Sequence, residues 1–268
     1  MLREPHVAGY FYPNQKKPLI KELSQKIDRA SEKIPAIAVI APHAGYMYSG
    51  KVAGAVYSSV EIPDRVVLLG PSHRPMASRF ALMREGAWAT PLGEVPIDSE
   101  LAGRILANTP LLSEDSEAHK GEHSLEVQIP FLQYLNPEIS IVPISTTYFA
   151  SLPDLEELGH AVASAIRSLE ESVLIVASTD MSHQVQEATA REKDFLAIDR
   201  IQALDPRGMY EVVQSEKISM CGFQATAAAL TAAIDLGAVQ AELIAYRTSG
   251  DATGDFTSVV GYAGIRVA

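Results

Sequence analysis

Three of the seven histidines come directly after short hydrophobic segments, where their side chains could bind a metal or move a proton. They are His43 after AIAVIAP, His73 after RVVLLGPS and His183 after SVLIVASTDMS. Apolar runs this short predict strands buried on both faces of a sheet. The carboxyl ends of parallel strands share one sheet edge, where open α/β sheets bind ligands, so the three imidazoles can meet there. Near neutral pH an imidazole can serve as a metal ligand or a proton acceptor.

The single cysteine, Cys221, could add a thiol to the same site. It precedes Gly222 and the expected start of an alanine-rich helix, and the positive end of a helix favours the thiolate form. Two imidazoles and a thiolate suit zinc, iron or copper rather than magnesium or calcium. The alternative for a lone cysteine is a small core residue without a chemical role.

Four residues near these positions have both a chemical and a structural interpretation. Asp180 either hydrogen-bonds to one of the rings or forms a turn at the end of a strand. His123 and Glu122 either contact the ligands or belong to a segment that caps the next helix through Ser124. Tyr46 either lines the pocket or packs in the core. Asp180 and His183 are therefore candidate catalytic residues, with the other three beside the site.

Other polar residues have a plainer interpretation. His6, His119 and His160 are expected to be surface or core histidines. Asp251 and Asp255 belong to the SGDATGD turn, where they favour turn formation, although a loop of this composition can also line a cleft.

The elements that must position these side chains alternate between helix and strand along the chain. This alternation predicts the α/β class, as a single-domain three-layer α/β/α sandwich with a central mixed, largely parallel sheet over residues 1–268. The expected helices cover residues 17–32, 50–59, 125–135, 154–170, 188–203, 206–213 and 223–236, with a further one capped by Asp98. The expected strands cover residues 36–41, 65–70, 139–144, 172–178, 240–245 and 258–267.

Three segments lack a clear periodicity. Residues 1–13 are expected to be extended, with Tyr10, Phe11 and Tyr12 packed against the body. Residues 80–97 contain frequent Gly and Pro and predict an irregular or hairpin segment. The acidic run 113–122 predicts a surface loop.

The composition excludes several classes of partner. A net charge of −11 and a pI near 5.1 argue against nucleic acid or anionic membranes, because both attract basic surfaces. No apolar run approaches the roughly 20 residues of a membrane span, and the N-terminus lacks the basic-then-apolar order of a signal peptide. One cysteine suits a reducing compartment, so we expect a cytoplasmic protein.

Seven segments, taken together and in this order, resemble the Memo family. They are VAGYFYP, APHAGYMYSG, LLGPSH, GEHSLEVQIPFLQ, STDMSH, MCGF and SGDATGD, and they span nearly the whole chain. Prokaryotic members of this family are often named AmmeMemoRadiSam system protein B. The resemblance therefore implies a functional link to a radical-SAM protein.

The resemblance also implies a fold similar to that of class III extradiol (LigB-type) dioxygenases, which use non-haem iron(II). By motif, His43 and His73 would be metal ligands, and Cys221 would stand where those enzymes have a glutamate ligand. His183 would match their acid/base histidine, with Asp180 beside it. Iron(II) is the first expected metal, and the softer thiolate shifts the preference toward copper(I) or zinc.

Three functions remain open at this point. The first is a metal-dependent oxidoreductase with iron or copper acting on an unidentified small molecule. The second is a peptide- or protein-binding adaptor without turnover, which the resemblance implies because the animal relatives are described as binding phosphotyrosine peptides. The third is a hydrolase in which zinc activates a water molecule.

Overall fold

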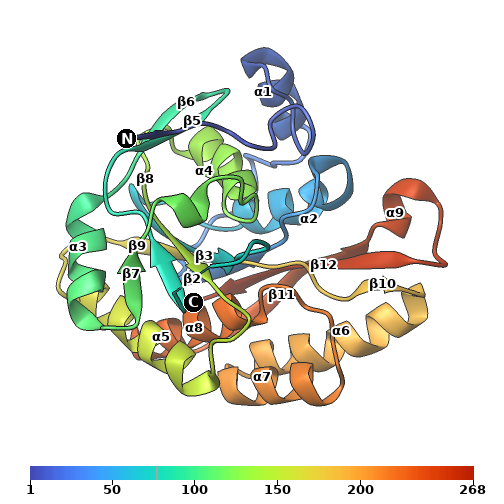
Figure 1. Ribbon diagram of the computed structural model, residues 1–268. Coiled ribbons are helices and arrows are strands. Elements are labelled where there is room, and N and C mark those ends of the chain that lie inside the picture. Colours follow the sequence, from blue (N-terminus) through green and yellow to red (C-terminus); the bar gives the residue numbers. More distant parts are fainter. Residues whose placement is uncertain (77) are drawn as a thin grey trace.

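A mixed β-sheet with helices on both faces forms the body of the protein, described here from a computed structural model (Figure 1). The structure describes residues 1–76 and 78–268. The helices are α1 (Lys16–Ser24), α2 (Tyr46–Ser58), α3 (Ser99–Asn108), α4 (Ile129–Leu135), α5 (Leu152–Arg167), α6 (Glu187–Gln202), α7 (Pro206–Ser215), α8 (Phe223–Asp235) and α9 (Gly250–Thr253), with 3-10 helices η1 (Glu117–His119) and η2 (Glu126–Gln128). Within the described ranges, no helix combines the length and apolar character needed to cross a membrane.

The strands form one large sheet and one small one. They are β1 (Leu2–Arg3), β2 (Ala38–Ala41), β3 (Arg65–Pro71), β4 (Phe80–Leu82), β5 (Ala87–Thr90), β6 (Gly93–Pro96), β7 (Leu112–Glu114), β8 (Ser140–Thr146), β9 (Val173–Ser178), β10 (His183–Val185), β11 (Ala241–Thr248) and β12 (Val259–Val267). The large sheet has the order β10-β12-β2-β9-β3-β8-β4-β7, with β11 paired to β12, and the small sheet has the order β1-β5-β6.

The centre of the large sheet is parallel and its flanks are partly antiparallel. Strands β2, β9, β3 and β8 run in the same direction, whereas β12 pairs antiparallel with β2 and β4 pairs antiparallel with β8. The register places Ala41 opposite Ser178 and Leu69 opposite Ala177. The loops after β2, β3 and β9 therefore leave the sheet at the same edge.

Two hydrophobic layers sandwich this sheet, as expected for a three-layer α/β/α fold. Side chains of α3, α5, α6, α7 and α8 form one layer, and side chains of α1, α2 and α4 form the other. Neighbouring residues of one strand point to opposite layers: Ile40 packs in the first and Val39 in the second. Strands that are buried on both faces explain the continuous apolar runs of the sequence.

Several helices differ from their expected bounds. Helix α1 ends at Ser24 rather than at residue 32, and two others differ for local reasons. Helix α2 begins before Gly50, because the chain turns into the helix directly after Gly45. It packs closely on the preceding segment: a Cβ on Gly54 would lie 2.2 Å from the backbone oxygen of Lys26. The expected helix over 125–135 is split into η2 and α4, since Pro130 has no N–H to donate and sits in the first turn of α4.

The segments without clear periodicity agree with the expectations in part, and the hairpin expected within residues 80–97 is confirmed. Residues 80–97 contain the β5–β6 hairpin as well as β4. The expectation of a surface loop over 113–122 is wrong at His119, which is fully buried. In the N-terminal segment Tyr12 is buried, but Tyr10 is 88% exposed and does not pack against the body.

Candidate metal centre

Three imidazoles meet at the carboxyl edge of the parallel strands. His43, His73 and His123 each offer a nitrogen atom within 4.8 Å of the others. The rings of His73 and His123 stack, with centroids 4.5 Å apart. The ring of His43 stands edge-on to both, at centroid distances of 5.3 and 5.5 Å. Three converging neutral nitrogens form a set of ligands that suits a transition metal.

Glu122 holds two of these histidines. Its carboxylate accepts hydrogen bonds from the backbone N–H of His73 at 2.6 Å, and from those of His123 and Ser124 at 2.8 Å each. It also accepts one from His73 Nδ1 at 2.9 Å, which leaves the His73 Nε2 lone pair free to bind a ligand. Burial would raise the pKa of Glu122, but these hydrogen bonds and the His73 charge lower it overall. Burial would lower the pKa of His73, and Glu122 raises it overall.

Behind Glu122 lies a buried arginine from the N-terminal segment. Arg3 donates to the backbone oxygens of His119 and Glu122, and it forms an ion pair with Glu126 at 2.8 Å. Its guanidinium lies 4.0 Å from the centroid of the Trp88 ring. Arg3 thereby ties together both ends of the loop that carries Glu122 and His123.

Glu126 fixes the N-terminal segment in turn. Its carboxylate accepts hydrogen bonds from two backbone N–H groups of this segment and from the Tyr12 hydroxyl. Phe11 of the same segment contacts the His123 ring, with centroids 4.9 Å apart. The first residues of the chain therefore form one wall of the histidine centre.

The ring of His43 is held by neutral partners instead. The single proton of the Ser178 hydroxyl goes to the Ser124 backbone oxygen at 2.6 Å. Ser178 Oγ must therefore accept from both Gln128 Nε2 at 2.7 Å and His43 Nδ1 at 3.0 Å. This fixes the proton on Nδ1 and leaves Nε2 of His43 as a potential ligand. Burial, followed by the His73 charge, lowers the pKa of His43 to about 3.

Cys221 and Asp180 lie on the other side of His43. Cys221 Sγ is 3.2 Å from His43 Nε2 and accepts a hydrogen bond from the Asp180 backbone N–H at 3.3 Å. The Asp180 carboxylate accepts from the backbone N–H groups of His43 at 2.8 Å and Ala44 at 3.3 Å. Asp180 therefore fixes the loop that carries His43, rather than a ring.

The thiolate expected at Cys221 is not favoured in this environment. Burial and the nearby Asp180 carboxylate raise the pKa of the thiol, and the helix end does not offset them. A bound cation would reverse this balance, because a coordinating thiol loses its proton.

The remaining two predicted residues lie apart from the three-imidazole cluster. His183 donates from Nδ1 to the Ser219 backbone oxygen at 2.8 Å, and its charge contributes to the lowered pKa of His43. Tyr46 is buried in the core, where its hydroxyl donates to the Val127 backbone oxygen at 2.7 Å. The structure therefore places Tyr46 among packing residues.

The residues that hydrogen-bond to the histidines and to their loops were not predicted from the sequence. Ser178 and Gln128 were available as polar residues inside otherwise apolar segments, which is a signal for buried hydrogen bonding. Arg3 and Glu126 gave no local signal, because they are 123 positions apart in the chain.

Comparison with known proteins agrees with the arrangement of the motifs. The Memo-like protein family matches residues 3–266. The chain belongs to this family. A MEMO1 family protein of Methanothermobacter thermautotrophicus is 42% identical, over 98% of this chain and 99% of the relative. A MEMO1 family protein of Aquifex aeolicus is 41% identical, over 98% of both chains.

Among solved structures, an uncharacterized protein of Escherichia coli K12 resembles this Memo-family chain. It is 13% identical, covers 86% of this chain and 99% of the other, and has a TM-score of 0.51. At this identity the likeness concerns the fold alone.

The three imidazoles of this Memo-family chain fit a transition metal, whereas Cys221 is not among the donors that all lie within 4.8 Å of one another and is near His43 alone. Ligand bonds of roughly 2.1 Å to nitrogen and 2.3 Å to sulfur place two ligands of one metal about 3–3.6 Å apart. The 3.2 Å between His43 Nε2 and Cys221 Sγ falls in that range. The fixed Nδ1 protons of His43 and His73 leave the opposite nitrogens available.

Proposed function

We propose that this Memo-family chain is a metal-dependent oxidoreductase that uses iron(II) or copper. His43, His73 and Cys221 would hold the metal, with His123 as a further nitrogen ligand. The observation that carries this proposal is the convergence of three imidazole nitrogens within 4.8 Å, with a thiol 3.2 Å from one of them. Iron or copper would supply one-electron chemistry at such a site.

His183 is the proposed acid/base. Its Nδ1 donates to a backbone oxygen, so Nε2 is left to accept and return a proton. Asp180 supports the reaction indirectly, since it holds the His43 loop and its amide holds the Cys221 sulfur. These roles agree with the proposed likeness to class III extradiol dioxygenases, with the difference that a thiol replaces a carboxylate ligand.

The substrate would enter beside His73. A hollow of about 300 Å³ is lined by this histidine, Arg74, Met76, Tyr148, Phe149 and three neighbouring residues. Tyr148 and Phe149 are 76% and 64% exposed, which is unusual for aromatic side chains outside a binding surface. A hollow of this size suits a small molecule.

The test is anaerobic loading of the protein with iron(II), copper(I) or zinc, followed by oxygen uptake with a panel of phenols. We expect turnover with iron or copper but not with zinc, and a loss of roughly 100-fold or more in the His183→Gln variant. The matched control is His160→Asn, because His160 is exposed and pairs with Asp235 on the surface. The proposal is overturned if neither the iron-loaded nor the copper-loaded protein takes up oxygen with any phenol of the panel.

A binding role without turnover is the second candidate, favoured by the exposed Tyr148 and Phe149. The pair would then contact a peptide or protein partner. A partner that is captured equally well by the wild type and by His73→Ala, but is lost in Phe149→Ser, would support this role. This role would be contradicted if His73→Ala no longer captured the partner and if capture by the wild type required added metal.

A further inference from the structure

Arg247, on β11, differs from the other arginines of the chain. Each of the others forms a hydrogen bond or an ion pair with a carboxylate or a carbonyl oxygen within the described residues. Arg247 has no such partner over residues 1–76 and 78–268. An arginine carries its charge at all ordinary pH values and has five N–H donors, so this side chain is available to an external acceptor.

Arg247 lines a hollow with a second free cation. The hollow has a volume of about 260 Å³, and its lining comes from α2, β11 and α9: Met47, Tyr48, Lys51, Arg247, Asp251 and Ala252. In the described part of the chain, neither the Lys51 ammonium nor the Tyr48 hydroxyl has a hydrogen-bond or ion-pair partner. Donors from two distant segments of the chain therefore meet at one place without an acceptor.

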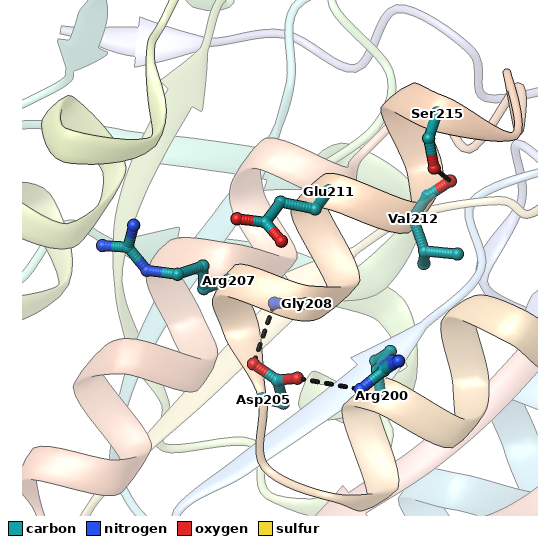
Figure 2. A pocket seen from close by; sticks show the side chains of 7 residues that line it. All are labelled: Arg200, Asp205, Arg207, Gly208, Glu211, Val212 and Ser215. Carbon is teal, nitrogen blue, oxygen red and sulfur yellow. Dashed lines mark hydrogen bonds and ion pairs between the residues drawn. The ribbon is translucent and has the colours of Figure 1, made fainter.

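A larger hollow on the surface provides a contrast. It measures about 570 Å³ over α6 and α7, and it also contains two arginines (Figure 2). There Arg200 pairs with Asp205 at 3.3 Å, and Arg207 pairs with Glu156 at 2.9 Å. In Figure 2 the Arg207 side chain points away from that first pair. The cations of this larger hollow are neutralised within the protein, whereas Lys51 and Arg247 are not.

The single acid in the smaller hollow is engaged elsewhere. Asp251 Oδ2 accepts a hydrogen bond from the Thr248 backbone N–H at 2.8 Å, which ties it to the end of β11. Two cations face this one carboxylate, so the hollow is positive in a chain with a net charge of −11. Such a local reversal of charge attracts anions and repels cations.

The hollow lies close to the histidine centre. Tyr48 lies in the first turn of α2, the helix that follows the His43 loop. Arg247 is opposite Tyr262 in the β11–β12 pair, and opposite residues of a strand pair share a face of the sheet. Burial raises the pKa of Tyr262, and the charges of Asp180 and Tyr48 raise it further, so Tyr262 is near one residue of the site and one of the hollow.

We propose that Lys51, Arg247 and the Tyr48 hydroxyl bind the oxyanion group, carboxylate or phosphate, of a small molecule. Arginine binds both groups with two parallel hydrogen bonds, and lysine adds a point charge. The volume of about 260 Å³ is below the roughly 300–1,000 Å³ of pockets for drug-sized ligands, so the ligand is small. This site is independent of the proposed redox chemistry.

The test is titration calorimetry of the full chain with inorganic phosphate, with malonate, and with malonamide as the uncharged analogue. We expect phosphate or malonate to bind and malonamide not to bind. Arg247→Met should weaken the binding at least tenfold and Lys51→Met about three- to tenfold, because each removes charge-assisted hydrogen bonds. If phosphate alone binds, the ligand carries a phosphate, and if malonate binds more tightly, it carries a carboxylate.

Two matched variants control for charge. Lys17→Met removes an exposed cation from α1, and Arg84→Met removes an arginine that pairs with Glu114. Both should bind the anion like the wild type. Because Lys51 and Arg247 make no polar contacts, their variants should also keep the wild-type unfolding temperature. The proposal is overturned if neither anion binds, if malonamide binds as well as malonate, or if Arg247→Met and Lys17→Met behave alike.

Discussion

The two sides of the histidine centre are held by different chemistry. On one side a single carboxylate, Glu122, holds His73 and His123, and a buried ion pair between Arg3 and Glu126 supports it. On the other side the ring of His43 is held by the neutral Ser178 hydroxyl, and its backbone by the Asp180 carboxylate. A buried charge that loses its partner is strongly destabilising, whereas a lost neutral hydrogen bond costs much less. Substitutions of the ring partners should therefore cost more on the first side than on the second.

The largest effect is expected for Arg3→Met, which leaves the Glu126 carboxylate without a cation and two backbone oxygens without their donor in the interior. We expect the free energy of unfolding to fall by about 3–5 kcal/mol, as measured by urea denaturation. The control Arg84→Met breaks an exposed ion pair and should change it by less than about 1 kcal/mol. Equal effects of the two substitutions would show that the buried ion pair is not what supports the Glu122 side.

His119 lies beside the same ion pair, and its titration makes the free energy of unfolding depend on pH. Burial, followed by the Arg3 charge, lowers the pKa of His119 to about 4. Since the folded-state pKa lies below the ordinary value of about 6.5, the stability is complete above pH 6.5 and is lost as the pH falls through 4. The loss reaches about 3 kcal/mol at most.

His119→Gln removes the proton-binding group, so the difference in unfolding free energy between wild type and variant should change between pH 6.5 and 4. His43 and His123 have lowered pKa values as well, but they are present in both proteins and cancel in this difference. Parallel stability curves over this range would contradict the prediction.

Glu122→Gln tests whether the hydrogen bonds of the carboxylate orient His73 and His123. The amide cannot accept all four hydrogen bonds that the carboxylate accepts, so both rings lose their fixed orientation. We expect the affinity for zinc, measured by competition with a chromophoric chelator, to fall about 10- to 100-fold. An unchanged zinc affinity would show that Glu122 does not orient the metal-binding histidines.

Ser178→Ala should have the smallest effect. It removes the acceptor for the Nδ1 proton of His43. Gln128 Nε2 still donates to the Pro42 backbone oxygen and keeps the loop before His43 in place. We expect a loss of zinc affinity of less than about tenfold. A loss larger than that of Glu122→Gln would reverse the contrast between the two sides.

The edge of the sheet was predictable from the sequence, because buried parallel strands are continuous apolar runs. His43, His73 and His183 were placed there by Ala38–Ala41, Arg65–Pro71 and Val173–Ser178. The membership of His123 in the imidazole cluster was not predictable in this way. It lies in a loop without periodicity, and its position depends on Glu122 and on Arg3, which is distant in sequence.

The proposal that His43, His73 and Cys221 hold one metal is best tested by the metal content of the purified protein. The protein is purified without oxygen, and the metal per chain is measured by elemental analysis for the wild type, Cys221→Ala and the control His160→Asn. The account predicts close to one iron or copper per chain in the wild type and the control, and a loss of most of it in Cys221→Ala. No stoichiometric metal in the wild type, or the same content in Cys221→Ala, would contradict it.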